Sequence, residues 1–145
     1  MALITGIAHV NLVVPRDTLD AARAFYGETL GFTSVPVPAL QRGTLAWFNI
    51  GDGPHPQQVH IAFGRDFDFT GEATASSRHP CFQVPSAETL LALQKRVWAH
   101  HEAGGSGAPR ACDQPGGESS GAKGVEYPTR FFARDYAGNR LEFSL

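Results

Sequence analysis

The stretch GIAHVNLVVP at residues 6–15 and the stretch RHPCFQVP at residues 78–85 decide the fold of this chain. Each is a short apolar run that contains a histidine and ends in valine and proline, just before a segment with helical periodicity. The two histidines, His9 and His79, lie 70 positions apart. Because a strand, a breaker and a helix recur in the same order, the sequence predicts two copies of one structural unit.

Two further apolar runs, QQVHIAFG at 57–64 and NRLEFSL at 139–145, also carry one polar residue at a comparable place. In a β-strand, successive side chains point to opposite faces. In each of the four runs the main apolar residues share one face, and His9, His60, His79 or Glu142 lies on the other. We therefore expect a polar concave surface on which a metal could bind.

The order of elements is a strand, a helix and three strands, and then the same again. The first module, about residues 1–64, is expected to contain strands at about 5–14, 32–37, 44–50 and 57–63 and a helix over TLDAARAFYGETL at 18–30. The second, about residues 77–145, is expected to contain strands near 79–84, 125–134 and 139–145 and a helix at 87–103. Within the second module, the glycine-rich segment from Gly104 to Gly124, which follows the helix, is long for a compact domain and is expected to be functional or mobile.

Composition places the chain among ordinary single-domain globular proteins. It has 145 residues, 42% of them apolar, and a net charge of -2. No basic field is present for nucleic acid or anionic lipid, and no apolar run is long enough for a membrane span. The two cysteines, Cys81 and Cys112, do not form a disulfide framework and fit a reducing compartment. Without a signal-peptide pattern, the protein is expected to be cytoplasmic.

The sequence resembles the vicinal oxygen chelate superfamily, which includes glyoxalase I, fosfomycin-resistance enzymes, extradiol dioxygenases and bleomycin-binding proteins. The resemblance covers nearly the whole chain, and its most specific parts are AFYGETLGF at 24–32 and the ending FFARDYAGNRLEFSL at 131–145. It implies an α+β fold in which two βαβββ modules form a curved mixed sheet around a metal cleft. It also implies a homodimer, in which each cleft is either built within one chain or shared between two.

The resemblance implies four metal ligands, because the family's metal sites use the first and fourth strands of each module. In this sequence these positions hold His9, His60, His79 and Glu142. Imidazole and carboxylate ligands suit iron(II), zinc, nickel, manganese or cobalt. A metal with open positions would act as a Lewis acid toward two vicinal oxygens of a substrate.

His60 departs from the glyoxalase pattern, because glyoxalase I carries a glutamate at that position. Glyoxalase proton transfer relies on carboxylate basicity at the metal, so Glu142 alone would have to serve as both ligand and catalytic base. His60 itself is either a fourth ligand, a hydrogen-bond donor to a ligand, or a substrate contact.

Arg130 and Tyr127 are candidate contacts for an anionic or phenolic substrate group. Arg130 could equally pair with Glu126 or Asp135. We expect Asp135 and Asn139 to shape the hairpin turn between the last two strands.

Three classes of function remain open. The first is a metal-dependent enzyme, a glyoxalase-like lyase or isomerase or a ring-cleaving dioxygenase, that acts on a small molecule. The second is a fosfomycin-type thiol transferase, for which the sequence offers no matching cationic phosphonate site. The third is a metal-free protein that sequesters a ligand, as bleomycin-binding proteins do.

Overall fold

The two modules have the same number and order of strands in the computed structural model, which describes residues 2–64, 76–121 and 129–145. The first contains β1 (His9–Val14), α1 (Leu19–Ala22), the π-helix η1 (Arg23–Thr29), β2 (Thr33–Val35), the 3-10 helix η2 (Ala39–Gln41), β3 (Leu45–Ile50) and β4 (Gln57–Phe63). The second contains β5 (Cys81–Gln83), α3 (Ala87–Ala103), β6 (Ala111–Cys112), β7 (Arg130–Arg134) and β8 (Arg140–Ser144).

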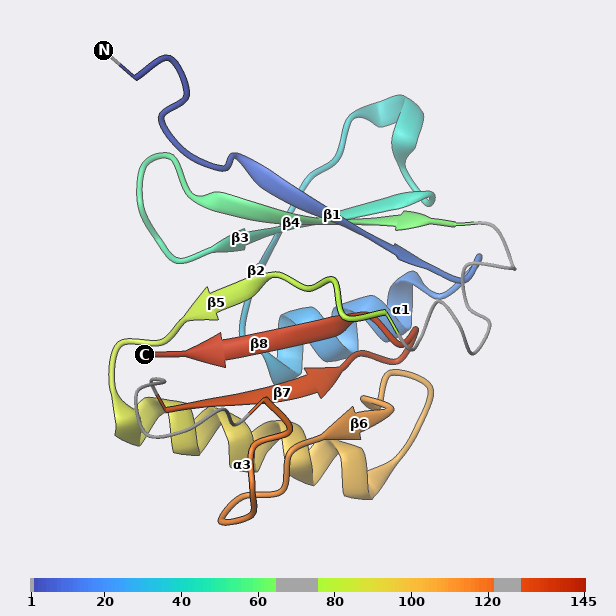
Figure 1. Ribbon diagram of the computed structural model, residues 1–145. Helices are drawn as coiled ribbons and strands as arrows, with labels where there is room; N and C mark the ends of the chain where they lie inside the picture. The colour runs from blue at the N-terminus through green and yellow to red at the C-terminus, as the bar shows by residue number, and fades with distance from the viewer. Residues whose placement is uncertain (1, 65–75, 122–128) are drawn as a thin grey trace.

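Each module forms its own four-stranded mixed sheet. The strand orders are β1-β4-β3-β2 and β5-β8-β7-β6; the first pair in each sheet is parallel and the other pairs are antiparallel. Figure 1 shows the two sheets as separate layers, with α3 packed beneath the sheet of the second module. The predicted α+β class with two βαβββ modules is confirmed, and β1 and β5 are edge strands of two distinct sheets.

The predicted first helix forms, but it changes type after one turn. Leu19, Ala22, Phe25 and Tyr26 are buried along it and form the apolar face of an amphipathic helix. The helix ends before Gly31, which has a φ of 79°. Only a residue without a Cβ adopts this left-handed conformation readily, so the glycine allows the chain to turn into β2.

The second helix begins and ends where the sequence indicates. The hydroxyl of Ser86 accepts a hydrogen bond from the Thr89 amide at 3.1 Å, and Gly104 closes the helix with a φ of 72°. No helix within the described residues is long and apolar enough to cross a membrane.

A buried polar network joins the two modules at the DYAGN turn. The Tyr26 hydroxyl donates to the fully buried Asp135 carboxylate at 2.6 Å, and the Asn139 side chain donates to the Val13 carbonyl at 2.9 Å. The amides of Ala137 and Asn139 donate to the same carboxylate, each at 2.9 Å. The predicted role in the turn is confirmed, and the same two side chains also fix the second module against the first.

The segment after α3 is more ordered than its composition suggests. Its described part contains β6, which pairs with β7, and the Asp113 carboxylate accepts hydrogen bonds from the amides of Ser120 and Phe132. A Cβ on Gly121 would overlap the Phe132 ring, so the chain approaches the sheet closely there. A strand of only two residues is too short to show the alternation of apolar and polar side chains, so β6 could not be predicted from the sequence.

Candidate functional site

The four predicted ligands are placed as two pairs, one on each sheet. His9 and His60 lie on β1 and β4, whereas His79 and Glu142 lie just before β5 and on β8. Within the described residues, no group of three or more histidine, cysteine or acidic side chains is placed to hold one metal ion. The expectation that the repeat gathers all four at one point is therefore not met within a single described chain, because each pair belongs to a separate sheet.

The second pair is in direct contact. His79 Nε2 lies 2.8 Å from Glu142 Oε2, and the side chains are 25% and 10% exposed. Parallel pairing sets this contact: Cys81 is the register partner of Glu142, and the Glu142 amide donates to the Pro80 carbonyl at 3.1 Å. The chain therefore enters β5 with His79 beside the Glu142 carboxylate.

The other ring nitrogen of His79 fixes its protonation pattern. Nδ1 lies 2.6 Å from the Ser77 carbonyl oxygen, which only accepts, so Nδ1 carries a proton. Nε2 then either carries a second proton and donates to Glu142, or presents a lone pair beside a carboxylate. In the second state a cation must lie between the two groups. A histidine whose Nδ1–H is held by a carbonyl is the usual arrangement for a metal ligand bound through Nε2.

The donor atoms of this pair fit a divalent metal. Ligands at about 2.0–2.2 Å from one ion are themselves about 3 Å apart when they occupy neighbouring positions. The 2.8 Å separation between His79 Nε2 and Glu142 Oε2 matches that value. One nitrogen and one oxygen suit zinc, iron(II), nickel or manganese, but two ligands are too few for a tight site.

Arg130 contacts the second oxygen of Glu142. Its Nη1 lies 3.0 Å from Oε1, and its Nη2 donates to the Gly121 carbonyl. Burial raises the pKa of Glu142, but the hydrogen bonds from His79 and Arg130 and their charges outweigh this effect, so the pKa is lowered overall. Glu142 is therefore an ionised carboxylate at neutral pH.

Arg130 does not form the predicted alternative pair with Asp135. The Asp135 carboxylate instead accepts hydrogen bonds from the side chains of Tyr26 and Asn139. Glu126 and Tyr127 lie outside the described residues, so the predicted substrate contact at Tyr127 stays a prediction. Cys81, also beside Glu142, has a raised pKa because of burial and the neighbouring carboxylate. Its thiol is therefore a weak nucleophile.

The first pair belongs to a stack of three rings. His60 lies between His9, at a centroid distance of 4.0 Å, and Trp47, at 4.4 Å, with the planes within 13° and 10° of parallel. His60 Nε2 lies 2.8 Å from the Gln58 side-chain oxygen. The lone pair of an imidazole lies in the ring plane, so two stacked imidazoles do not aim at one ion in this geometry. The stack holds the exposed His9 ring in a fixed orientation, and the packing of the parallel rings against one another stabilises this arrangement.

Two further features of this face have consequences for binding. The buried indole N–H of Trp47 has no hydrogen-bond partner within the described part of the chain. Burial and the neighbouring His9 lower the pKa of His60, so His60 is neutral at neutral pH. This face therefore carries no formal charge at His60.

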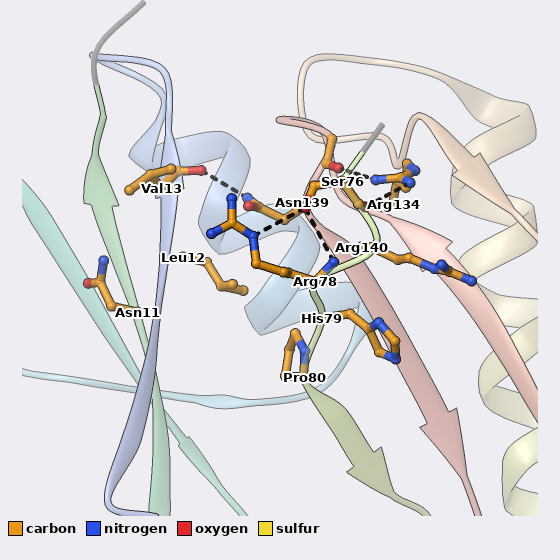
Figure 2. A pocket seen from close by; sticks show the side chains of 11 residues that line it. Asn11, Leu12, Val13, Ser76, Arg78, His79, Pro80, Arg134, Asn139 and Arg140 are labelled. Carbon is orange, nitrogen blue, oxygen red and sulfur yellow. Dashed lines mark hydrogen bonds between the residues drawn. The ribbon is translucent and has the colours of Figure 1, made fainter. Parts of the chain in front are cut away.

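The sequence reading missed a cluster of arginines beside His79. Arg78, Arg134 and Arg140 line a pocket between β1 and the β7–β8 turn (Figure 2). Strand alternation could have placed two of them on the polar faces, because Arg140 shares a strand face with Glu142 and Arg134 shares one with Arg130, although it does not show that they meet.

Comparisons with known proteins connect this geometry to solved structures. No family model and no curated protein matches the sequence. A crystal structure of a candidate glyoxalase family protein from Bacillus anthracis is 26% identical, with a TM-score of 0.69 and coverage of 99% of this chain and 96% of that one.

Two other structures are similar over nearly their whole length. Lactoylglutathione lyase from Agrobacterium tumefaciens is 19% identical, with a TM-score of 0.59 and coverage of 99% and 95%. The fosfomycin resistance protein FosX from Listeria monocytogenes, crystallised with Mn(II) and sulfate, is 15% identical, with a TM-score of 0.68 and coverage of 98% and 90%. The chain therefore has the fold of the vicinal oxygen chelate superfamily, as its sequence predicts.

Proposed function

We propose that this protein is a metal-dependent enzyme of the glyoxalase and dioxygenase type, acting on a small molecule with vicinal oxygens. The observation that carries the proposal is the His79–Glu142 pair, with donor atoms 2.8 Å apart and His79 Nδ1 held by the Ser77 carbonyl at 2.6 Å. The similarity to glyoxalase, lyase and FosX structures supports the superfamily and the use of a divalent metal in general.

In this proposal each residue of the second module has a defined task. His79 and Glu142 hold the metal, which supplies Lewis acidity toward substrate oxygens. Arg130 keeps Glu142 ionised and fixes its second oxygen. A lyase would require Glu142 to serve both as metal ligand and as the group that accepts the substrate proton.

We propose that the site is completed across a homodimer, in which His9 of one chain, held against the His60 ring, faces His79 and Glu142 of the other. An exposed apolar segment supports this arrangement. Leu3, Ile4 and Ile7 are 94%, 85% and 64% exposed just before β1, an apolar arm that a second copy would cover.

Metal analysis tests the enzyme proposal directly. Protein purified without a nickel column is expected to hold close to one divalent metal per chain. A content below about 0.2 per chain, with no tight uptake on addition of metal, would overturn it. The matched control is His55→Ala, which removes an exposed histidine in the turn before β4 and is expected to leave the metal content unchanged.

A mixing experiment tests the shared cleft. His9→Ala and His79→Ala chains each lose one half of every site. If sites are shared, each mixed dimer regains one intact cleft, so about one quarter of all clefts bind metal after equal mixing. If each site lies within one chain, no mixture recovers binding.

The metal and substrate then separate the two enzyme classes. Iron with oxygen uptake on catechols is the expected result for a ring-cleaving dioxygenase. Zinc or nickel with turnover of hemithioacetals is the expected result for a lyase.

A metal-free ligand-binding protein is the second candidate, and one observation favours it. If His79 is doubly protonated, then His79, Glu142 and Arg130 form a closed ionic cluster that needs no metal. That candidate predicts no metal uptake and unchanged ligand affinity in the presence of a chelator.

A further inference from the structure

The pocket beside His79 is lined by three arginines and, among the described residues, by no acidic side chain. It has a volume of about 430 Å³ and lies where β1 meets the start of the second module and the β7–β8 turn. The three arginines are Arg78, Arg134 and Arg140. Figure 2 shows Arg78 extended toward β1, with Arg134 and Arg140 on the other side of the pocket.

The three guanidinium groups are held by neutral groups. Arg134 donates to the carbonyls of Gly138 at 2.9 Å and Ser76 at 3.1 Å. The Arg78 Nε donates to the Ser76 hydroxyl at 3.4 Å. Arg140 lies over the Phe132 ring, with 4.2 Å between its Cζ and the ring centroid. These contacts orient the cations but do not neutralise them, so the charge remains available to a ligand.

The electrostatics of the pocket favour an anion. Burial lowers the pKa of Arg134, and the neighbouring charge of Arg140 lowers it further, with Asp135 opposing in part. Like charges held close together repel, and an anion between them would relieve that repulsion and accept hydrogen bonds from the guanidinium groups. Arg78, which lines the pocket, is exposed to solvent.

We propose that this pocket binds an anionic oxygen group, a carboxylate or a phosphate, on the substrate of the candidate metal site. His79 lines the pocket and also contacts Glu142, so a molecule anchored by its anionic group at the arginines would extend toward the metal pair. The assignment to the substrate rests on the proposed function. Anion binding by the pocket does not, because the arginines need no metal to attract it.

The test is a titration of metal-free protein with inorganic phosphate and, separately, with acetate, followed by NMR of the arginine side chains. The wild type is expected to show saturable shifts of Arg78, Arg134 and Arg140, with dissociation constants of roughly millimolar order. Arg78→Gln is expected to weaken binding about tenfold, the effect of losing one charge-assisted contact. Arg42→Gln, which removes an exposed arginine of the first module, should change it less than twofold.

The two probes and the metal-free condition make every outcome informative. Tighter binding of phosphate assigns a phosphate group, and tighter binding of acetate assigns a carboxylate. Absence of saturable shifts with both probes, or equal weakening by Arg78→Gln and Arg42→Gln, would overturn the inference. Metal uptake without anion binding would overturn this inference alone, whereas anion binding without metal uptake would leave the pocket and remove the proposed enzyme.

Discussion

The polar faces of the two modules use the same strand positions for different chemistry. In the first module, His60 lies in a stack with Trp47 and His9. In the second, Glu142 lies between His79 and Arg130 in an ionic cluster. Equivalent positions of the repeat therefore hold different groups. The first module has the neutral imidazole of His60, oriented by ring stacking, and the second has the charged carboxylate of Glu142, held by hydrogen bonds. We infer that the two halves have complementary roles at one metal, with charge neutralisation supplied by the second module.

The largest expected effect is on metal affinity. His79→Ala removes a nitrogen that lies against the anionic ligand, and we expect affinity to fall by more than the roughly 10–100-fold loss typical of residues that only support ligands. His60→Phe preserves the ring stack and is expected to cost less than about tenfold. Isothermal titration with zinc or manganese measures both. Equal losses would make His60 a ligand and remove the contrast between the modules.

The next effect concerns stability. Glu142→Leu removes the carboxylate that Arg130 and His79 contact in a partly dehydrated site, and we expect a loss of about 2–3 kcal/mol in the free energy of unfolding. His60→Leu removes one ring from a partly exposed stack and is expected to cost about 1 kcal/mol. Urea denaturation of the metal-free proteins compares the two. If His60→Leu lowered the free energy of unfolding as much as Glu142→Leu, the ionic cluster around Glu142 would not be the main polar contribution to stability.

The pH dependence of stability should separate the two faces. The pKa of His60 is lowered from 6.5, so its contribution is present above pH 6.5 and is lost as pH falls through its folded pKa. The pKa of Glu142 is lowered from 4.5, so its contribution is present above pH 4.5 and is lost as pH falls further.

His60→Phe is therefore expected to flatten the stability curve just below pH 6.5, and Glu142→Gln to flatten it below pH 4.5. Thermal melts at closely spaced pH values measure both windows. If His60→Phe instead flattened the curve below pH 4.5, or Glu142→Gln flattened it just below pH 6.5, the pKa assignments would be wrong.

The smallest effect is expected at Trp47. Trp47→Phe keeps a ring against His60 and removes a buried N–H that has no partner in the described residues. Removing an unpaired buried donor offsets the lost ring area, so we expect a stability change within about 0.5 kcal/mol. A loss above about 2 kcal/mol would show that the indole N–H has a partner in the folded protein.

Much of the fold could be predicted because its signals are local. The alternation of Val59 and Ile61 against Gln58 and His60 places β4, and both of those apolar residues are fully buried. Ser86 and Gly104 define the ends of α3. The π-helical turn at Arg23–Thr29 and the two-residue β6 were not predictable, since their geometry depends on packing and pairing with distant segments.

The candidate site was predictable residue by residue but not in its arrangement. Strand alternation identified His9, His60, His79 and Glu142, because a side-chain face depends only on position along the strand. Arg130 was noticed, but its partner was not, since Glu142 lies opposite it only after β7 and β8 pair. The arginine pocket needed the approach of β1 to the β7–β8 turn, which no local pattern contains.

The sequence by itself determined the two modules, the faces of their strands and the kinds of ligand atoms that those faces carry. These properties follow from periodicity and residue chemistry along the chain. Only the tertiary structure decided that the candidate ligands fall into two pairs, that His60 is held in a ring stack, and that three arginines meet beside His79. Each of these depends on contacts between residues far apart in the chain, which register and sheet packing bring together.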